Sequence, residues 1–249
     1  MRIFSLVSLL CVASVLSADV MYEMTSTTSG MMGMKAETQM RVFVKGDRSL
    51  TEMTAENPMT GPMSDTKIIR LDKGVIWSID HENEQYSEHS LETMTGATEE
   101  YEETEMEMPE LKVVSTGEKK QILKKDCEQV IVSMESAGEE GKMIFKQTMW
   151  VTKEIPGYKE IQAFQKQMAE SGLGASSAMR GPNKKNYEEF QKKISEIDGF
   201  PLEIDMDITM MSGEGMSFTM TTHSEVTKIE TKPVNDRVFE IPAGYSLQE

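Results

Sequence analysis

The chain has 249 residues, of which 26 are lysine or arginine and 42 are acidic, giving a formal net charge of −16. This acidic balance argues against nucleic acid and anionic membrane surfaces as partners. Only one of the two cysteines, Cys127, lies beyond the first 18 residues, so no intramolecular disulfide is expected there and the fold has to be held by an apolar core.

The first 18 residues have the pattern of a secretory signal peptide. Arg2 supplies the positive charge, and residues 3–16 form an apolar run too short to span a membrane comfortably. Small residues at positions 17 and 18 permit cleavage there. We therefore expect an exported chain, periplasmic or extracellular, whose mature part, residues 19–249, is a single domain without an integral membrane segment. An uncleaved anchor is the alternative.

Strands are expected to dominate the mature part. Apolar and polar residues alternate, which places every second side chain on a buried face. Glycine-containing turns at 72–74 and 138–141 join neighbouring strands into hairpins. The expected strands are 20–28, 36–44, 50–56, 66–71, 75–79, 85–91, 111–115, 121–124, 128–134, 143–152, 202–210, 216–220 and 238–241.

Two loops interrupt these strands. Residues 57–64 carry Pro58, Gly61 and Pro62, which suit an edge loop. Residues 93–110 hold seven glutamates and no basic residue, which predicts a solvated acidic loop. An acidic cation site is the alternative for this second loop.

Residues 157–198 form a helical insertion. Two groups of apolar residues follow helical spacing, and residues 171–186 between them are rich in glycine and serine. Each helix is amphipathic and needs an apolar surface to cover, for which the concave face of the sheet is the candidate. The two groups are Tyr158, Ile161, Phe164 and Met168, then Tyr187, Phe190, Ile194 and Ile197.

Two short motifs, at 150–158 (Trp-Val-Thr-Lys-Glu-Ile-Pro-Gly-Tyr) and 238–245 (Val-Phe-Glu-Ile-Pro-Ala-Gly-Tyr), carry a resemblance. With the strand order of residues 20–245, they make the chain resemble the LolA/LolB-like lipoprotein carriers, and most closely the uncharacterised exported domains of that superfamily. The resemblance implies a mainly β fold with a helical insertion (α+β): a curved antiparallel half-barrel sheet covered by helices on its concave face. The acidic charge, the many methionines and the long insertion depart from the family, so only the fold and the hydrophobic cavity are carried over.

Residues 202–220 predict a β-hairpin with one apolar face. The acidic side chains between the apolar ones form a solvated opposite face. A three-residue loop centred on Gly213 gives the pairs Met210 with Met216, Ile208 with Phe218 and Met206 with Met220. The candidate ligand-binding residues are therefore Met206, Ile208, Met210, Met216, Phe218 and Met220, with Trp77 and Trp150 as neighbours.

An enzyme is not expected. The three histidines, His81, His89 and His223, lie among polar residues without a recognisable catalytic partner. No serine or cysteine occupies a nucleophile motif, and no glycine-rich phosphate loop follows a strand. No cofactor is expected either.

The 23 methionines decide the functional expectation. Methionine is adaptable and is common on surfaces that accept varied apolar partners. We expect an exported non-enzymatic protein that holds an apolar ligand (an acyl chain, a lipid or a hydrophobic protein segment) in a methionine-rich cavity. Two alternatives stay open: a Cu(I)-binding protein that uses the thioethers of Met31, Met32 and Met34, and a structural or interaction domain with a filled core.

Overall fold

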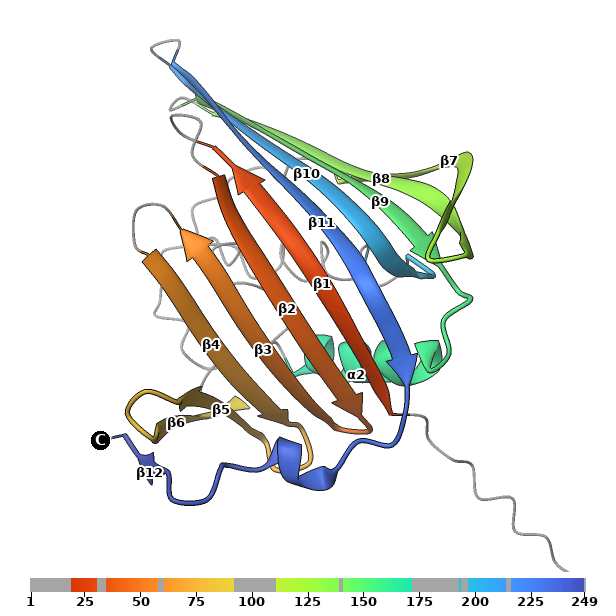
Figure 1. Cartoon of the computed structure of the whole chain (residues 1–249). Coiled ribbons are helices and arrows are strands. Elements are labelled where there is room, and N and C mark those ends of the chain that lie inside the picture. The colour runs from red at the N-terminus through yellow and green to blue at the C-terminus, as the bar shows by residue number, and fades with distance from the viewer. Residues whose placement is uncertain are drawn as a thin grey trace, which may run out of the picture.

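The computed structural model describes residues 19–30, 35–57, 61–91, 111–138, 141–171, 193, 197–213 and 216–248. These residues form a 12-stranded sheet, the helix α2 (Tyr158–Glu170) and a short 3-10 helix η3 (Asp236–Phe239), shown in Figure 1. The strands are β1 Val20–Ser29, β2 Lys35–Lys45, β3 Arg48–Asn57, β4 Gly61–Arg70, β5 Val75–Asp80, β6 Gln85–Ser90, β7 Lys112–Ile122, β8 Lys125–Gly138, β9 Gly141–Thr152, β10 Phe200–Ser212, β11 Ser217–Thr231 and β12 Ser246–Leu247.

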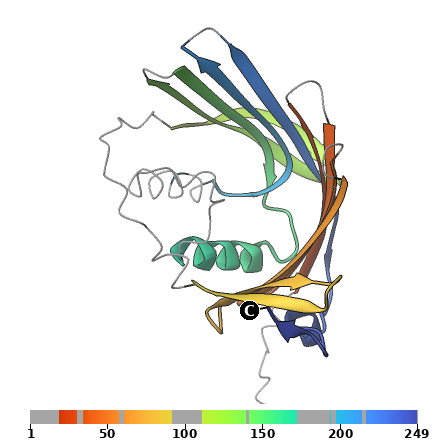
Figure 2. The ribbon, with the colours of Figure 1, turned by 90° about the vertical axis from the view of Figure 1, so that its left-hand side faces the viewer.

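The strands follow one another across the sheet in the order β12-β6-β5-β4-β3-β2-β1-β11-β10-β9-β8-β7. Neighbours run antiparallel except for β12 and β6, which are parallel. The centre of the sheet joins β1 to β11, near opposite ends of the chain. Within the described residues β12 and β7 are free edges, so the sheet is open, and Figure 2 shows that it is curved.

The two faces of the sheet can be followed across the strands, because directly paired residues share a face. We call inner the face that carries Val42, Ile208 and Phe145, and outer the opposite face. Helix α2 lies on the inner face, on the hollow side of the sheet in Figure 2. Its Phe164 packs with Val42, and its Ile161 is buried in a cluster with residues of β1, β10 and β11.

The strands at the β12 end carry an apolar cluster on the outer face. Leu50, Ile68 and Trp77 share this cluster with Phe239, which is fully buried. The buried Arg70 guanidinium fixes this C-terminal segment, since it donates to the Phe239 carbonyl at 3.2 Å and forms ion pairs with Asp72 and Glu240. The end of the chain therefore covers this part of the outer face.

The mainly β fold is confirmed, with local corrections. The strand expected at 216–220 is the longer strand β11, which continues to Thr231. Residues 61–64 belong to β4 rather than to a loop; Pro62 is tolerated there because only residues 66–70 of β4 pair with β5. Residues 112–122 form one strand, β7, with an irregularity in register, in place of the two strands expected at 111–115 and 121–124. Residues 238–241 were expected as a strand, but residues 238 and 239 belong to the 3-10 helix η3. The Asn235 side chain caps the start of this helix by accepting the Arg237 backbone N–H.

Several sequence predictions fall outside the described residues. These are the signal peptide at 1–18, the acidic loop at 93–110 and most of the insertion between α2 and residue 197. In the part of the chain that the structure describes, no helix has the length and apolar character needed to cross a membrane.

Candidate functional site

The hairpin of β10 and β11 places the predicted apolar residues on one face, in a corrected register. Met210 pairs with Phe218, and Ile208 with Met220. Met211 pairs with Ser217, so the connection is longer than the expected three residues. Ser212 closes it by donating its backbone N–H to the Met216 carbonyl at 2.8 Å. The register differs from the expected one by two residues, which leaves every side chain on its predicted face.

Burial falls along this hairpin from its base to its tip. Met206 and Ile208 pack against a buried cluster that includes Val132 and Phe145. At the tip, Met210 is 48% and Met216 68% exposed. Apolar side chains that remain this exposed are candidates for contact with a ligand or partner.

Phe218 and Met220 lie between these two extremes. Both are half-buried on the inner face of β11 and lie beside Gly30 at the end of β1. Together with Met206, Ile208 and Met210 they continue the apolar surface from β10 onto β11.

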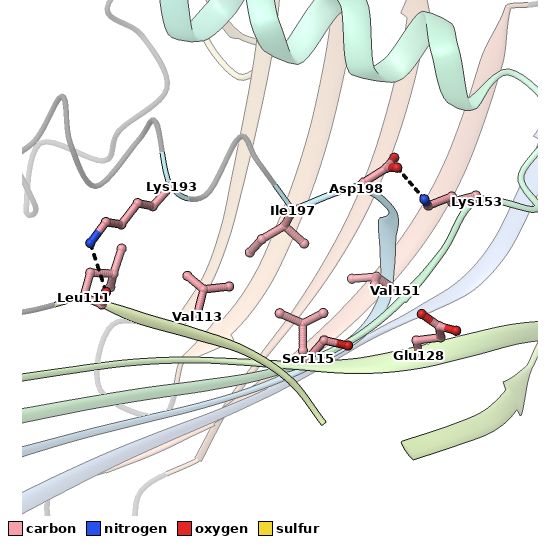
Figure 3. Close-up of a pocket in the computed structure, with 10 residues that line it drawn as sticks. Leu111, Val113, Ser115, Glu128, Val151, Lys153, Lys193, Ile197 and Asp198 are labelled. Atoms are coloured by element: carbon pink, nitrogen blue, oxygen red, sulfur yellow. Dashed lines mark hydrogen bonds and ion pairs between the residues drawn. The ribbon is translucent and has the colours of Figure 1, made fainter. Parts of the chain in front are cut away.

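A pocket of about 570 Å³ opens at the β7 edge of the same face (Figure 3). Val113, Val130 and Val151 supply its apolar lining, with Ser115 and Glu128 beside them, and Ile197 lies across from Val113 on the segment that leads into β10. Val130 and Val151 belong to the cluster that also packs against Met206, so the pocket and the hairpin share one apolar surface.

Charged groups stand at the rim of this pocket. Lys153 forms an ion pair with Asp198, and the Lys193 ammonium donates to the Leu111 carbonyl at 3.1 Å. Hydrogen bonds from Lys153 and Tyr158 lower the pKa of Asp198, and the bond to Asp198 raises the pKa of Lys153. Both groups therefore keep their charges at neutral pH, so the pocket combines an apolar lining with charged groups.

A family model described as "Domain of unknown function (DUF4412)" matches residues 23–245. The chain belongs to this family. Among solved structures, this DUF4412 chain is similar to a LolA superfamily protein from Nitrosomonas europaea, with 7% identity, 90% of this chain and 91% of that chain covered, and a TM-score of 0.31. The search of curated proteins found no match.

Two predicted neighbours of the ligand surface lie elsewhere in this DUF4412 domain. Trp77 belongs to the outer-face cluster, where its indole N–H donates to the Glu88 carboxylate at 2.8 Å. Trp150 pairs with Glu203 and also faces outward, because it adjoins the inward-facing Met149. The loop methionines Met31, Met32 and Met34 lie outside the described residues.

The pocket was not predicted from the sequence. Residues 111–115 were expected as a strand and Ile197 as a helical apolar position, but no local pattern indicates that the two meet. The contact depends on how the segment before β10 returns to the sheet, which is a tertiary feature.

Potential metal ligands gather on the opposite side of the hairpin. Within the described residues, donor atoms of Glu203, Asp205 and His223 lie within 4.8 Å of one another on the outer face. The sheet therefore separates this polar group from the apolar surface.

Proposed function

We propose that this chain is a non-enzymatic binding protein that holds an apolar ligand on the inner face of β8 to β11. The ligand is an acyl chain, a lipid or a hydrophobic segment of another protein. The observation that supports this proposal is a continuous apolar surface, which begins at the pocket beside Val113 and ends at the exposed Met210 and Met216. Contiguous exposed apolar surface of this kind is typical of sites that bind a ligand or a partner.

The side chains of this surface suit a ligand of variable shape. Methionine is unbranched and has three rotatable bonds, so it adapts to different apolar partners. Burying ten methylene groups would contribute about 8 kcal/mol, from which the costs of association are subtracted. Micromolar affinity is therefore within reach without a closely fitted cavity.

The insertion at 157–198 has a place in this proposal. Helix α2 packs on the inner face through Ile161 and Phe164. We propose that the insertion as a whole covers the concave face and encloses the ligand. We also propose that residues 1–18 direct export, so that residues 19–249 meet the ligand outside the cytoplasm as one domain.

The proposal can be tested with a fluorescent fatty acid and a pair of variants on one hairpin. Met210→Asp together with Phe218→Asp puts two charges on the apolar surface, and we expect at least tenfold weaker binding because an unpaired charge is costly in an apolar site. Thr219→Asp is the matched control, since Thr219 is exposed on the outer face of β11. It should bind the probe as tightly as the unmodified chain.

Native mass spectrometry tests the alternative of a structural domain. If it shows neither a co-purifying lipid nor a complex with the fatty acid, a structural domain with a filled core is favoured. Equal loss of binding in the control would show that charge anywhere on the hairpin acts through folding, and would contradict the assignment to the inner face.

A further inference from the structure

The outer face of the β10–β11 hairpin brings four ionisable side chains together as two cross-strand pairs. Asp205 pairs with His223, and Glu203 pairs with Glu225. The His223 Nδ1 atom lies 2.7 Å from an Asp205 carboxylate oxygen. Since the backbone ladder fixes both strands, these side chains are held by rigid elements rather than by a loop.

The negative charge of this group favours a cation beside it. Glu203 and Glu225 face each other across two strands and repel, which destabilises the hairpin. The Lys120 ammonium of β7 compensates in part, because it lies 2.6 Å from a Glu203 oxygen. Three carboxylates thus share one lysine and one histidine.

The donor atoms have the chemistry and the spacing of a metal site. Imidazole with carboxylates is a ligand set used for Zn²⁺ and neighbouring divalent metals. Bonds of 2.0–2.2 Å place tetrahedral ligand atoms about 3.4 Å apart. The donors of Glu203, Asp205 and His223 lie at most 4.8 Å apart, and the closest two 2.7 Å, so small side-chain rotations would suffice.

We propose that Glu203, Asp205 and His223 form a binding site for a divalent transition-metal ion, for which Zn²⁺ is the probe. The ion replaces the proton between His223 and Asp205, and Glu203 supplies a third ligand while Lys120 turns away. Water completes the coordination, because His223 and Asp205 are half-exposed. The ion joins β10 to β11 and thereby fixes the register of the hairpin that carries the apolar surface on its other face.

Isothermal titration of the untagged chain with zinc chloride tests this site. We expect one ion per chain with micromolar affinity, and at least tenfold weaker binding in His223→Gln and in Asp205→Asn. Asp207→Asn is the matched control, because Asp207 is the next acidic residue on the same face of β10 and undergoes the same change of charge. Its affinity should stay within twofold of the unmodified chain.

A second measurement does not depend on the variants folding. Of the three histidines in the chain, only the imidazole NMR signals of His223 should shift or broaden as zinc is added to the unmodified protein. Absence of zinc binding, binding that survives His223→Gln, or equal weakening in Asp207→Asn would overturn the proposal. The last result would show diffuse attraction to an acidic surface.

Discussion

The apolar cluster that contains Phe239 and the apolar surface of the β10–β11 hairpin lie at opposite ends of the sheet and on opposite faces. At the β12 end, Leu50, Ile68 and Trp77 lie on the outer face in one cluster with Phe239 of the C-terminal segment. At the β7 end, the apolar surface lies on the inner face, where Val113 and Met210 stay exposed. The first cluster is closed by the chain itself, while the described residues leave the second partly open. The comparison separates apolar surface that maintains the fold from apolar surface that we assign to a ligand.

The largest expected effect comes from emptying the closed cluster. Phe239→Ala should lower the free energy of unfolding by about 3–5 kcal/mol, because a fully buried aromatic ring leaves a cavity. Met210→Ala should cost less than about 1 kcal/mol, since that side chain is half-exposed. Urea unfolding of the two variants measures the contrast. Similar losses in both would erase the distinction between the two ends.

The open surface can be tested at the pocket with two adjacent valines. Val113 faces the pocket, and Val114 faces away on the same strand; they are 40% and 52% exposed. Val113→Asp should weaken fatty-acid binding about tenfold, because it places a charge in the apolar lining. Val114→Asp should leave the affinity unchanged. Fluorescence titration compares the two, and equal affinities would remove the pocket from the binding surface.

Acid should lower the free energy of unfolding through the carboxylates that hold the C-terminal segment beside the Phe239 cluster. Hydrogen bonds from Arg70 lower the pKa of Asp72. Burial tends to raise the pKa of Glu240, but hydrogen bonds from Lys73 and Arg70 outweigh it and lower the value. Carboxylates with a lowered folded-state pKa stabilise the protein above their usual range near pH 4, and this contribution is lost as the pH falls through the lowered values.

The free energy of unfolding should therefore fall between about pH 5 and 2, and by less in Glu240→Gln. Glu118→Gln is the control, since Glu118 is an exposed side chain of β7. Chemical unfolding across this pH range measures both slopes. A Glu240→Gln slope equal to that of the unmodified chain would exclude this ion pair as a source of acid sensitivity.

The smallest expected effect is on zinc binding at the outer face of the β10–β11 hairpin. Lys120→Met removes the ammonium that competes with a metal ion for Glu203, and should strengthen zinc binding about two- to fivefold, the range of an exposed charge interaction. In the unmodified chain the Lys120 ammonium lies 4.2 Å from the centre of the Trp150 ring. The methionine side chain keeps the apolar contact with this ring. Lys119→Met is the control, because Lys119 pairs with Glu128 instead. Calorimetry should find the control unchanged.

The strands and the helix start were readable from the sequence because period-two and helical patterns are local. The register of the β10–β11 hairpin was not, since a shift by two residues preserves every face. The expected register sets Asp205 opposite Thr221, whereas the structure sets it opposite His223. The expected strand also ended at residue 220, before His223, so neither the register nor the strand bounds brought the candidate metal ligands together.

The period-two alternation also predicts which side chains share a face of the sheet. It does not predict which segment of the chain covers that face. Trp77 was expected to be a neighbour of the ligand surface. Its side chain belongs to the cluster that also contains Phe239, which lies 162 positions further along the chain. Only the path of the C-terminal segment decides it.

The pairing of β1 with β11 has a consequence for folding. The Ser26 hydroxyl donates to Ser224, 198 residues further along the chain. Folding rates fall as contacts become more distant in sequence, because a long loop must close before such contacts form. The centre of the sheet cannot assemble until β11 has been synthesised. The chain is therefore expected to fold slowly and after translation, and until then to offer the unfinished edge of β1 to chaperones or to aggregation.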